Sequence, residues 1–279
     1  MPELPEVETT ARGLRPRFVG RRVTSVGGVD WPRMLPNATE PDLADALIGH
    51  TVTSIDRRGK YLLIGFENDA WLSVHRKMSG NLLLQPAESA PPLHTHLEVV
   101  LDDGVALRFV DPRKFGRIHL FHSLDERDDF LNERLGPDSL VDFDARVLAE
   151  KIRGRRGRVK SLLLDQAFLA GVGNLYADEA LWLSKIHPLR TADTLTGLEV
   201  KRLAEAIRQV FLDAIARRGT SFDGNYRDQD GQPGENQAFL NAYGCQDEPC
   251  PRCGTRIHRI IVGGRGTHFC PKCQKLPRH

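Results

Sequence analysis

The sequence contains no long apolar run. Its 279 residues are 40% hydrophobic, but no stretch approaches the roughly 18 to 20 uninterrupted apolar residues that span a bilayer, so nothing indicates a membrane protein. The first residues, MPELPEVETT, lack the basic and apolar segments of a signal peptide and are acidic where a transit peptide is basic. We therefore expect a cytoplasmic protein whose N-terminus is retained, shortened by Met1.

Internal repeats and low-complexity segments are also absent. A repeat architecture is thereby excluded, and the length favours about two ordinary globular domains with a sizeable core.

A large net charge is missing as well, because the total is only +2. The charges are nevertheless segregated: residues 1–150 hold 18 Lys and Arg against 24 Asp and Glu, whereas residues 151–279 hold 21 against 13, which gives −6 and +8. The last thirty residues carry seven Lys or Arg and no acid. This distribution favours a polyanionic partner for the C-terminal part, with a solubilising tail as the alternative.

The first half of the chain predicts mainly β-structure. Six short segments are rich in β-branched or aromatic residues and bounded by turn residues, as in an antiparallel sandwich or barrel. A helix is predicted before them, over 8–18, and a loop over 85–96. The strand segments are 21–29, 50–59, 60–66, 70–75, 96–101 and 105–110.

Beyond residue 125 the pattern becomes helical. The clearest amphipathic helix covers 197–219, with Leu203, Ile207 and Val210 on one face and Gly219 as its stop. A polar, Gly-rich loop follows over 220–239. A loop of that length in a compact domain is usually functional or disordered.

Four of the five cysteines have the spacing of a zinc ribbon: Cys250-x2-Cys253-x16-Cys270-x2-Cys273. Two such pairs at the base of a hairpin complete a tetrahedral site of four thiolates, which is closed and therefore structural. A redox pair or an iron–sulfur site is the alternative. Cys245 is left over and is expected to be an unpaired thiol.

The hairpin between the two cysteine pairs places Arg265 at a Gly-flanked turn. Its planar guanidinium matches phosphate oxygens, so on a basic ribbon it predicts a phosphate contact; a solvated turn arginine is the alternative.

Six motifs occur in register along nearly the whole chain. They are PELPEVE at the start, GK at 59–60, MSG at 78–80, DPRKFG at 111–116, DQAFLAGVGNLYADEAL at 165–181, and the four-cysteine ribbon. Together they closely resemble the formamidopyrimidine-DNA glycosylases of the Fpg/Nei family, from residue 2 to about residue 275.

The resemblance implies an α+β fold in three parts. Residues 1–130 would form an N-terminal antiparallel β-sandwich with its helix. Residues 131–244 would form a helical domain with a helix-two-turn-helix motif and a lesion-capping loop, and residues 245–279 the zinc-ribbon hairpin with one structural Zn²⁺.

The resemblance also gives the opening residues a catalytic role. Removal of Met1 would expose Pro2 as a secondary amine that attacks C1′ of a damaged nucleoside and forms a Schiff base. An α-amino group has a pKa of about 7.7 to 8.0 against about 10.4 for lysine, so far more of it is neutral at pH 7. Glu3 would be the general acid and proton shuttle, and Glu6 would position the sugar or the amine. Acids favoured at a helix N-terminus are the alternative for both.

Four further residues match phosphate contacts of the family. They are Lys60, which we group with the catalytic residues, His75, Asn174 and Arg265. They would bend the DNA so that the damaged nucleotide swings out. Standing alone, Lys60 would be interpreted as a solvated strand end and His75 as an interior histidine.

Met78, Arg113 and Phe115 match the trio that fills the hole left by the flipped base. Phe115 would wedge between base pairs, Met78 would occupy the void, and Arg113 would face the orphaned base. Without the motif, Met78 and Phe115 would be core residues.

Two segments depart from the family pattern. RKMSG at 76–80 stands where LGMSG is usual, so Lys77 replaces a turn glycine. The stretch 230–245 keeps Gly231, Pro233 and Gly234 but lacks the aromatic residue usual after that glycine, and Cys245 stands where a basic residue is usual. That stretch covers the extruded base in relatives.

The resemblance therefore implies a bacterial, monomeric, bifunctional DNA glycosylase and AP lyase acting on oxidised purines in damaged double-stranded DNA. A Nei-like enzyme for oxidised pyrimidines is the second hypothesis, disfavoured by PELPE where that branch has PEGPE. A non-catalytic lesion-binding zinc protein is the third.

Overall fold

The computed structural model describes residues 2–222 and 224–276, and it consists of two compact units. Unit 1 comprises the described residues of 1–133 and 215–237, and unit 2 those of 134–214 and 238–279. The sequence placed 215–237 with the helical part of the chain, whereas its contacts place it with the β-rich part.

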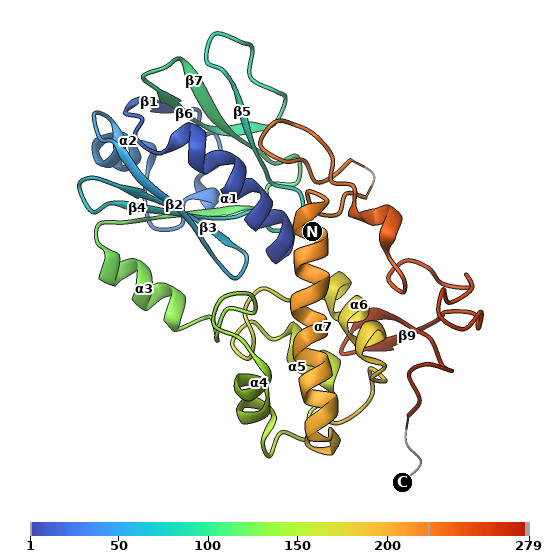
Figure 1. Ribbon diagram of the computed structural model, residues 1–279. Coiled ribbons are helices and arrows are strands. Elements are labelled where there is room, and N and C mark those ends of the chain that lie inside the picture. The colour runs from blue at the N-terminus through green and yellow to red at the C-terminus, as the bar shows by residue number, and fades with distance from the viewer. Residues whose placement is uncertain (1, 223, 277–279) are drawn as a thin grey trace. The chain divides into compact units, whose positions relative to one another are not determined.

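Unit 1 contains a β-sandwich of two four-stranded antiparallel sheets, ordered β1-β6-β7-β5 and β2-β3-β4-β8 (Figure 1). The sandwich fold is thereby confirmed, although β5 and β8 lie outside the predicted strand segments. The elements of unit 1 are α1 (Leu4–Phe18), β1 (Val23–Gly27), η1 (Pro32–Met34), α2 (Glu40–Leu47), β2 (Val52–Arg58), β3 (Tyr61–Phe66), β4 (Trp71–His75), β5 (Asn81–Pro86), β6 (Thr95–Leu101), β7 (Val105–Val110), β8 (Arg117–Phe121) and α3 (Leu124–Asn132).

Helix α1 packs its apolar face into the core of the sandwich, where Val7, Leu14 and Phe18 are buried among residues of both sheets. The helix begins at Leu4, earlier than the predicted start at residue 8, because its first turn is capped. Glu3 is the N-cap residue, and the side chain of Glu6 accepts a hydrogen bond from the Glu3 backbone N–H at 2.8 Å. The cap fixes the chain direction at the first residues.

Unit 2 is helical and ends in a β-hairpin. Two elements, α7 and η3, cross the division between the units. None of the described helices is both long and apolar enough to cross a bilayer. The elements are α4 (Ala145–Ile152), α5 (Val159–Leu164), α6 (Asn174–Ser184), η2 (Ala192–Thr194), α7 (Gly197–Ala216), η3 (Asn236–Phe239), β9 (His258–Val262) and β10 (Arg265–Phe269).

The predicted amphipathic helix is confirmed as α7. It ends at Ala216, and the chain reverses through Arg218 and Gly219, which both have positive φ angles (59° and 82°). Such a left-handed pair beyond the last turn is a common helix stop.

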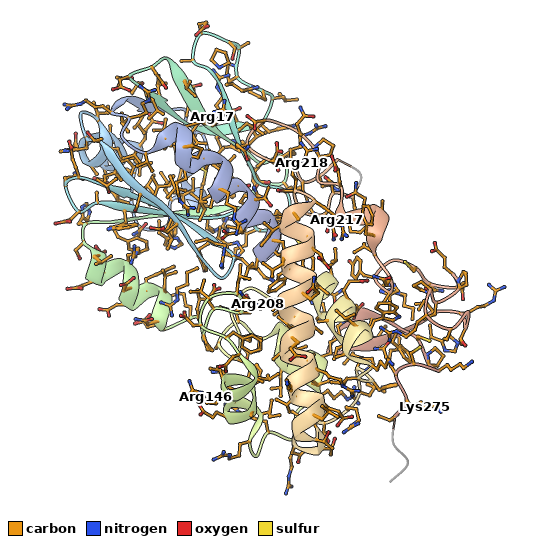
Figure 2. The ribbon with its side chains drawn as sticks, in the orientation of Figure 1. Arg17, Arg146, Arg208, Arg217, Arg218 and Lys275 are labelled. Atoms are coloured by element: carbon orange, nitrogen blue, oxygen red, sulfur yellow. The ribbon has the colours of Figure 1, made fainter. Side chains whose placement is uncertain are left out.

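Segment 219–237, which contains most of the loop predicted over 220–239, packs against the β-rich part of unit 1. The backbone N–H of Leu84 in β5 donates to the carbonyl of Gln229 at 2.8 Å. Two ion pairs also hold the segment, one from Arg17 of α1 to Asp230 and one from Arg218 to Glu235. Figure 2 shows Arg17 near the end of α1 and Arg218 just beyond α7. The segment is therefore anchored at several points.

Candidate functional site

The first residues of unit 1 bring an acid pair beside a buried proline. Pro2 is buried, and Glu3 and Glu6 are 4% and 2% exposed. One oxygen of Glu6 accepts from the Glu3 N–H and the other from the Thr220 N–H, both at 2.8 Å. The structure thus gathers the predicted Pro2, Glu3 and Glu6, and it adds Thr220 from segment 219–237. Met1 lies outside the described residues.

Lys60 and His75 lie on neighbouring strands of one sheet. Lys60 precedes Tyr61 in β3, and Tyr61 pairs directly with His75 at the end of β4. The Tyr61 and His75 rings are in edge contact, with centroids 4.8 Å apart. Lys60 and His75 therefore lie at the same end of the sheet, near enough for the Lys60 charge to lower the pKa of His75.

A buried arginine shapes the turn that carries Lys60. The Nε atom of Arg57 donates to Glu8 at 2.9 Å, and its Nη1 donates to the Gly59 carbonyl at 3.1 Å. Burial raises the pKa of Glu8, but hydrogen bonds from Arg12 and Arg57 outweigh it and lower the pKa overall. Glu8 is thus an ionised anchor on α1 that orients the turn of Lys60 through Arg57.

His75 is a neutral imidazole in this environment. Burial lowers its pKa to about 3, and the nearby charges of Lys77 and Lys60 act in the same direction. Its Nδ1 lies 3.1 Å from the backbone N–H of Lys77 and accepts its hydrogen bond. The ring proton is therefore assigned to Nε2, which makes this edge of His75 a neutral hydrogen-bond donor.

Met78 and Phe115 are exposed rather than in the core. They are 41% and 44% exposed, and Arg113 stacks over the Phe115 ring at 4.8 Å from its centroid. Two large apolar side chains and an arginine at loop tips are suited to insertion into a base stack. Lys77 has a φ of 54°, the left-handed conformation in which a turn glycine is usual.

One carboxylate joins the two loops that carry these three residues. Asp111 is fully buried and accepts from the Ser79 hydroxyl at 2.5 Å. Its other oxygen accepts from the backbone N–H groups of Phe115 and Gly116, each at 2.8 Å. The Met78 loop and the Phe115 loop thus share an anchor, which the sequence did not reveal as such.

In unit 2, Asn174 and Arg265 lie near the β9–β10 hairpin. Asn174 opens α6, and its Nδ2 donates to the Gly266 carbonyl at 3.0 Å. Gly263 and Gly264 both have positive φ angles, as a tight two-residue hairpin turn requires, and exposed Arg265 follows them. The Asn174 contact joins the start of β10, just after the turn, to the start of α6.

A buried ion pair that sequence reasoning missed holds the same hairpin. Lys160 and Asp178 are both 0% exposed and lie 2.6 Å apart. Lys160 also donates to the Gly266 carbonyl and the Thr267 hydroxyl, and Asp178 accepts from the His268 N–H. The sequence does contain one indication of this pair, because Asp178 lies inside the apolar run NLYADEALWL. An acid on a buried helix requires a partner.

The four predicted cysteines form a cluster suited to a metal ion. Their Sγ atoms all lie within 4.8 Å of one another, and Cys253 and Cys270 are 3.5 Å apart. Zn–S bonds of about 2.3 Å give sulfur separations of about 3.8 Å in a tetrahedron, so the set fits Zn²⁺. Trp182 of α6 donates to Cys250 and packs against the cluster. The zinc is therefore structural and anchors the hairpin on α6.

Cys245 is a free thiol outside this cluster. Burial raises its pKa to about 11, and the carboxylates of Glu248 and Glu179 act in the same direction. At neutral pH it is protonated and is a poor nucleophile.

Comparison with known proteins supports the same interpretation along the whole chain. Three family models match: the formamidopyrimidine-DNA glycosylase N-terminal domain over residues 1–118, the H2TH domain of those enzymes over 135–224, and a zinc finger found in FPG and IleRS over 247–276. A formamidopyrimidine-DNA glycosylase of Herpetosiphon aurantiacus is 47% identical over 277 residues, covering 98% of this chain and 100% of that protein.

Solved structures with the same fold contain damaged DNA. A variant of Lactococcus lactis Fpg in complex with Fapy-dG DNA has a TM-score of 0.90 at 37% identity, covering 99% of this chain and 100% of that one. A MutM complex with DNA containing carbocyclic 8-oxo-G has a TM-score of 0.89 at 38% identity, with the same coverage.

Proposed function

Because the chain belongs to the formamidopyrimidine-DNA glycosylase family, we propose that it excises oxidised purines from duplex DNA and cleaves the resulting abasic site through an N-terminal proline Schiff base. The observation that carries the proposal is the buried Pro2 beside Glu3 and Glu6 at the capped start of α1. A DNA-binding protein without catalysis has no need of an amine in that position.

The chemistry begins at the amine left by removal of Met1. The Pro2 nitrogen forms a bond to C1′ while the glycosidic bond breaks, and the N–H proton of Pro2 leaves with the base. Glu3 donates a proton to the ring oxygen, the sugar opens, and a cationic iminium remains at C1′.

Strand cleavage follows from the same intermediate. The iminium carries no removable N–H, so it stays cationic and withdraws electrons from C2′. Loss of a C2′ proton to Glu3 expels the 3′ phosphate, and a second elimination expels the 5′ phosphate. Glu6, held by the N–H groups of Glu3 and Thr220, keeps this end of α1 in place.

The remaining predicted residues bind the DNA in this proposal. Lys60 and His75 of unit 1 contact phosphates, His75 as a neutral donor, and Asn174 and Arg265 of unit 2 do the same. The exposed Met78, Arg113 and Phe115 fill the space of the flipped nucleotide. Residues 230–237, the part of segment 219–237 that belongs to the predicted capping stretch 230–245, cover the extruded base.

The test offers the protein three duplexes, carrying 8-oxoguanine, an oxidised pyrimidine or an abasic site, in the presence of borohydride. We expect a covalent adduct on the 8-oxoguanine and abasic duplexes, with the 8-oxoguanine duplex ahead of the pyrimidine. An adduct that favours the pyrimidine would assign a Nei-like substrate range. Binding without any adduct would leave only a lesion-binding protein.

A further inference from the structure

Arg76 is a charged side chain buried in the interior of unit 1. It follows β4 and is 1% exposed, among the largest fully buried side chains among the described residues. Its carbonyl accepts from the Gly80 N–H at 3.0 Å, so its backbone also fixes the loop that carries Met78. None of the proposed chemistry uses this guanidinium.

The hydrogen bonding of Arg76 is incomplete for a buried arginine. Nη1 donates to the Thr10 hydroxyl of α1 at 2.8 Å, and the guanidinium carbon lies 4.9 Å from the centre of the Tyr226 ring. Nε and Nη2 have no hydrogen-bond partner within the described part of the chain. Burial lowers the pKa of Arg76, and the fields of Tyr226 and Glu6 partly offset this effect.

Arg108 is a matched arginine in the same unit, also 1% exposed. Its Nε donates to Glu98 at 2.6 Å, and its two terminal nitrogens donate to Ser89 and to the Ala87 carbonyl, among others. All three guanidinium nitrogens of Arg108 therefore donate hydrogen bonds to described residues, whereas Nε and Nη2 of Arg76 do not.

The two partners of Arg76 converge on Glu6. The Thr10 hydroxyl donates to the Glu6 carbonyl at 3.0 Å, and the Tyr226 hydroxyl donates to the same carbonyl at 3.4 Å. Tyr226 belongs to segment 219–237, whose Thr220 N–H holds the Glu6 carboxylate. Arg76 thus packs against both α1 and the segment at the point where they meet.

Close packing continues along the same contact. Gly13 of α1 lies against the side chain of Gln229, and a Cβ added at Gly13 would come within 2.0 Å of the Gln229 Cδ. The segment therefore packs directly against α1 at Gly13, and the Arg76 charge lies within the fields of Glu6 and Asp228.

We propose that Arg76 is a positioning residue for base excision. It holds the described residues of segment 219–237 against α1 so that they can cover an extruded base. The inference rests on the proposed function. An abasic site has no base to cover, and Glu6 also accepts from the Glu3 N–H, which is independent of the segment. Arg76 should therefore matter for base removal and not for cleavage of a preformed abasic site.

The experiment compares Arg76→Leu with Arg108→Leu in the full-length, zinc-containing protein. Single-turnover rates are measured on an 8-oxoguanine duplex and on an abasic duplex, together with the urea midpoint. For Arg76→Leu we expect base excision to slow by on the order of tenfold to a hundredfold, with abasic cleavage and the midpoint retained. For Arg108→Leu we expect a lower midpoint and an unchanged ratio of the two rates.

Arg76→Lys, which keeps the charge, should recover part of the lost excision rate. Parallel loss of both activities in Arg76→Leu, or no loss of excision, would overturn the inference. A wild-type protein that neither excises bases nor cleaves abasic sites would instead overturn the proposed function itself.

Discussion

At the level of single residues, the environment of a few side chains sets their chemistry. His75 is the clearest case, since its pKa of about 3 lies far below the ordinary value of about 6.5. A phosphate contact made by this ring is a hydrogen bond from a neutral donor, with little net charge to be screened by salt.

The lowered pKa of His75 predicts a pH-dependent stability. Between pH 6.5 and pH 3 the unfolded chain binds a proton that the folded chain does not, so stability falls as pH falls through this window. By pH 5 the wild type should lose about 2 kcal/mol more than His75→Gln, at about 1.4 kcal/mol per pH unit. Urea unfolding at pH 7.5 and pH 5 measures the difference. Parallel losses in the two proteins would mean that His75 is protonated in the fold.

Arg265 allows a test of phosphate binding. Arg265→Ala should weaken binding to every duplex and reduce the slope of log K against log salt by about 0.9, the value for one phosphate contact. The control is Arg256→Ala, because Arg256 is bonded to the Asp247 carbonyl of its own ribbon. Equal slopes in the Arg265 variant and the wild type would remove Arg265 from the interface.

The candidate site residues could be predicted from the sequence where they belong to a motif. The motifs located Pro2, Glu6 and the cysteines. In the structure the N-terminal residues form one cluster and the cysteines form another. The motifs could not reveal that Asp111 bonds to two loops, or that Arg76 is buried, because both facts depend on contacts between segments far apart in sequence.

At the scale of elements, the hairpin that carries Arg265 is held by helix α6. The Lys160–Asp178 pair and the Asn174 contact both bind residues of β10. Removing one member of a buried ion pair destabilises the fold, mainly because the other member is left as an uncompensated charge in the interior.

Lys160→Met should therefore destabilise the protein by about 3 to 5 kcal/mol, because it leaves Asp178 charged and buried. Lys201→Met is the control, since Lys201 is exposed on α7 and pairs only loosely with Glu205 at 3.9 Å; its effect should stay within about 0.5 kcal/mol. Chemical unfolding of the two variants decides the matter. Similar midpoints for both would show that the buried pair has little energetic weight.

Element boundaries were predicted where local patterns determine them. The periodicity of α7 and the strand composition of β2, β3 and β4 were sufficient. Strands β5 and β8 were missed, and α1 starts earlier than predicted because the capping box between Glu3 and Glu6 extends it. Capping was visible in the letters PELPEVE, but the same acids also suited a catalytic interpretation.

At the level of the whole molecule, the residues of the candidate site are distributed over two units. Unit 1 carries Pro2 and the loops of Met78 and Phe115, and unit 2 carries Asn174, Arg265 and the zinc cluster. The sequence predicted this order of parts, but not that segment 219–237 belongs to unit 1, because helical and loop patterns carry no information on which distant surface a segment contacts.

Loss of the zinc ion should affect DNA binding by the whole protein. Cys253→Ser should abolish the stoichiometric zinc and strongly weaken DNA binding, because the four-thiolate site holds the hairpin. Cys245→Ser is a matched control, a partly buried cysteine outside the cluster, and should keep one zinc per chain and full affinity. Metal analysis and binding assays are the readouts. Retained affinity in a zinc-free Cys253 variant would contradict a structural role for the metal.

The most direct test of the central claim is mass spectrometry of the protein after borohydride reduction with an abasic duplex and digestion. We predict that the deoxyribose remnant is attached to a peptide that begins with Pro2, with Met1 removed, and that Pro2→Gly gives much less of it. A remnant attached to a lysine, or full activity in a preparation that retains Met1, would contradict the account.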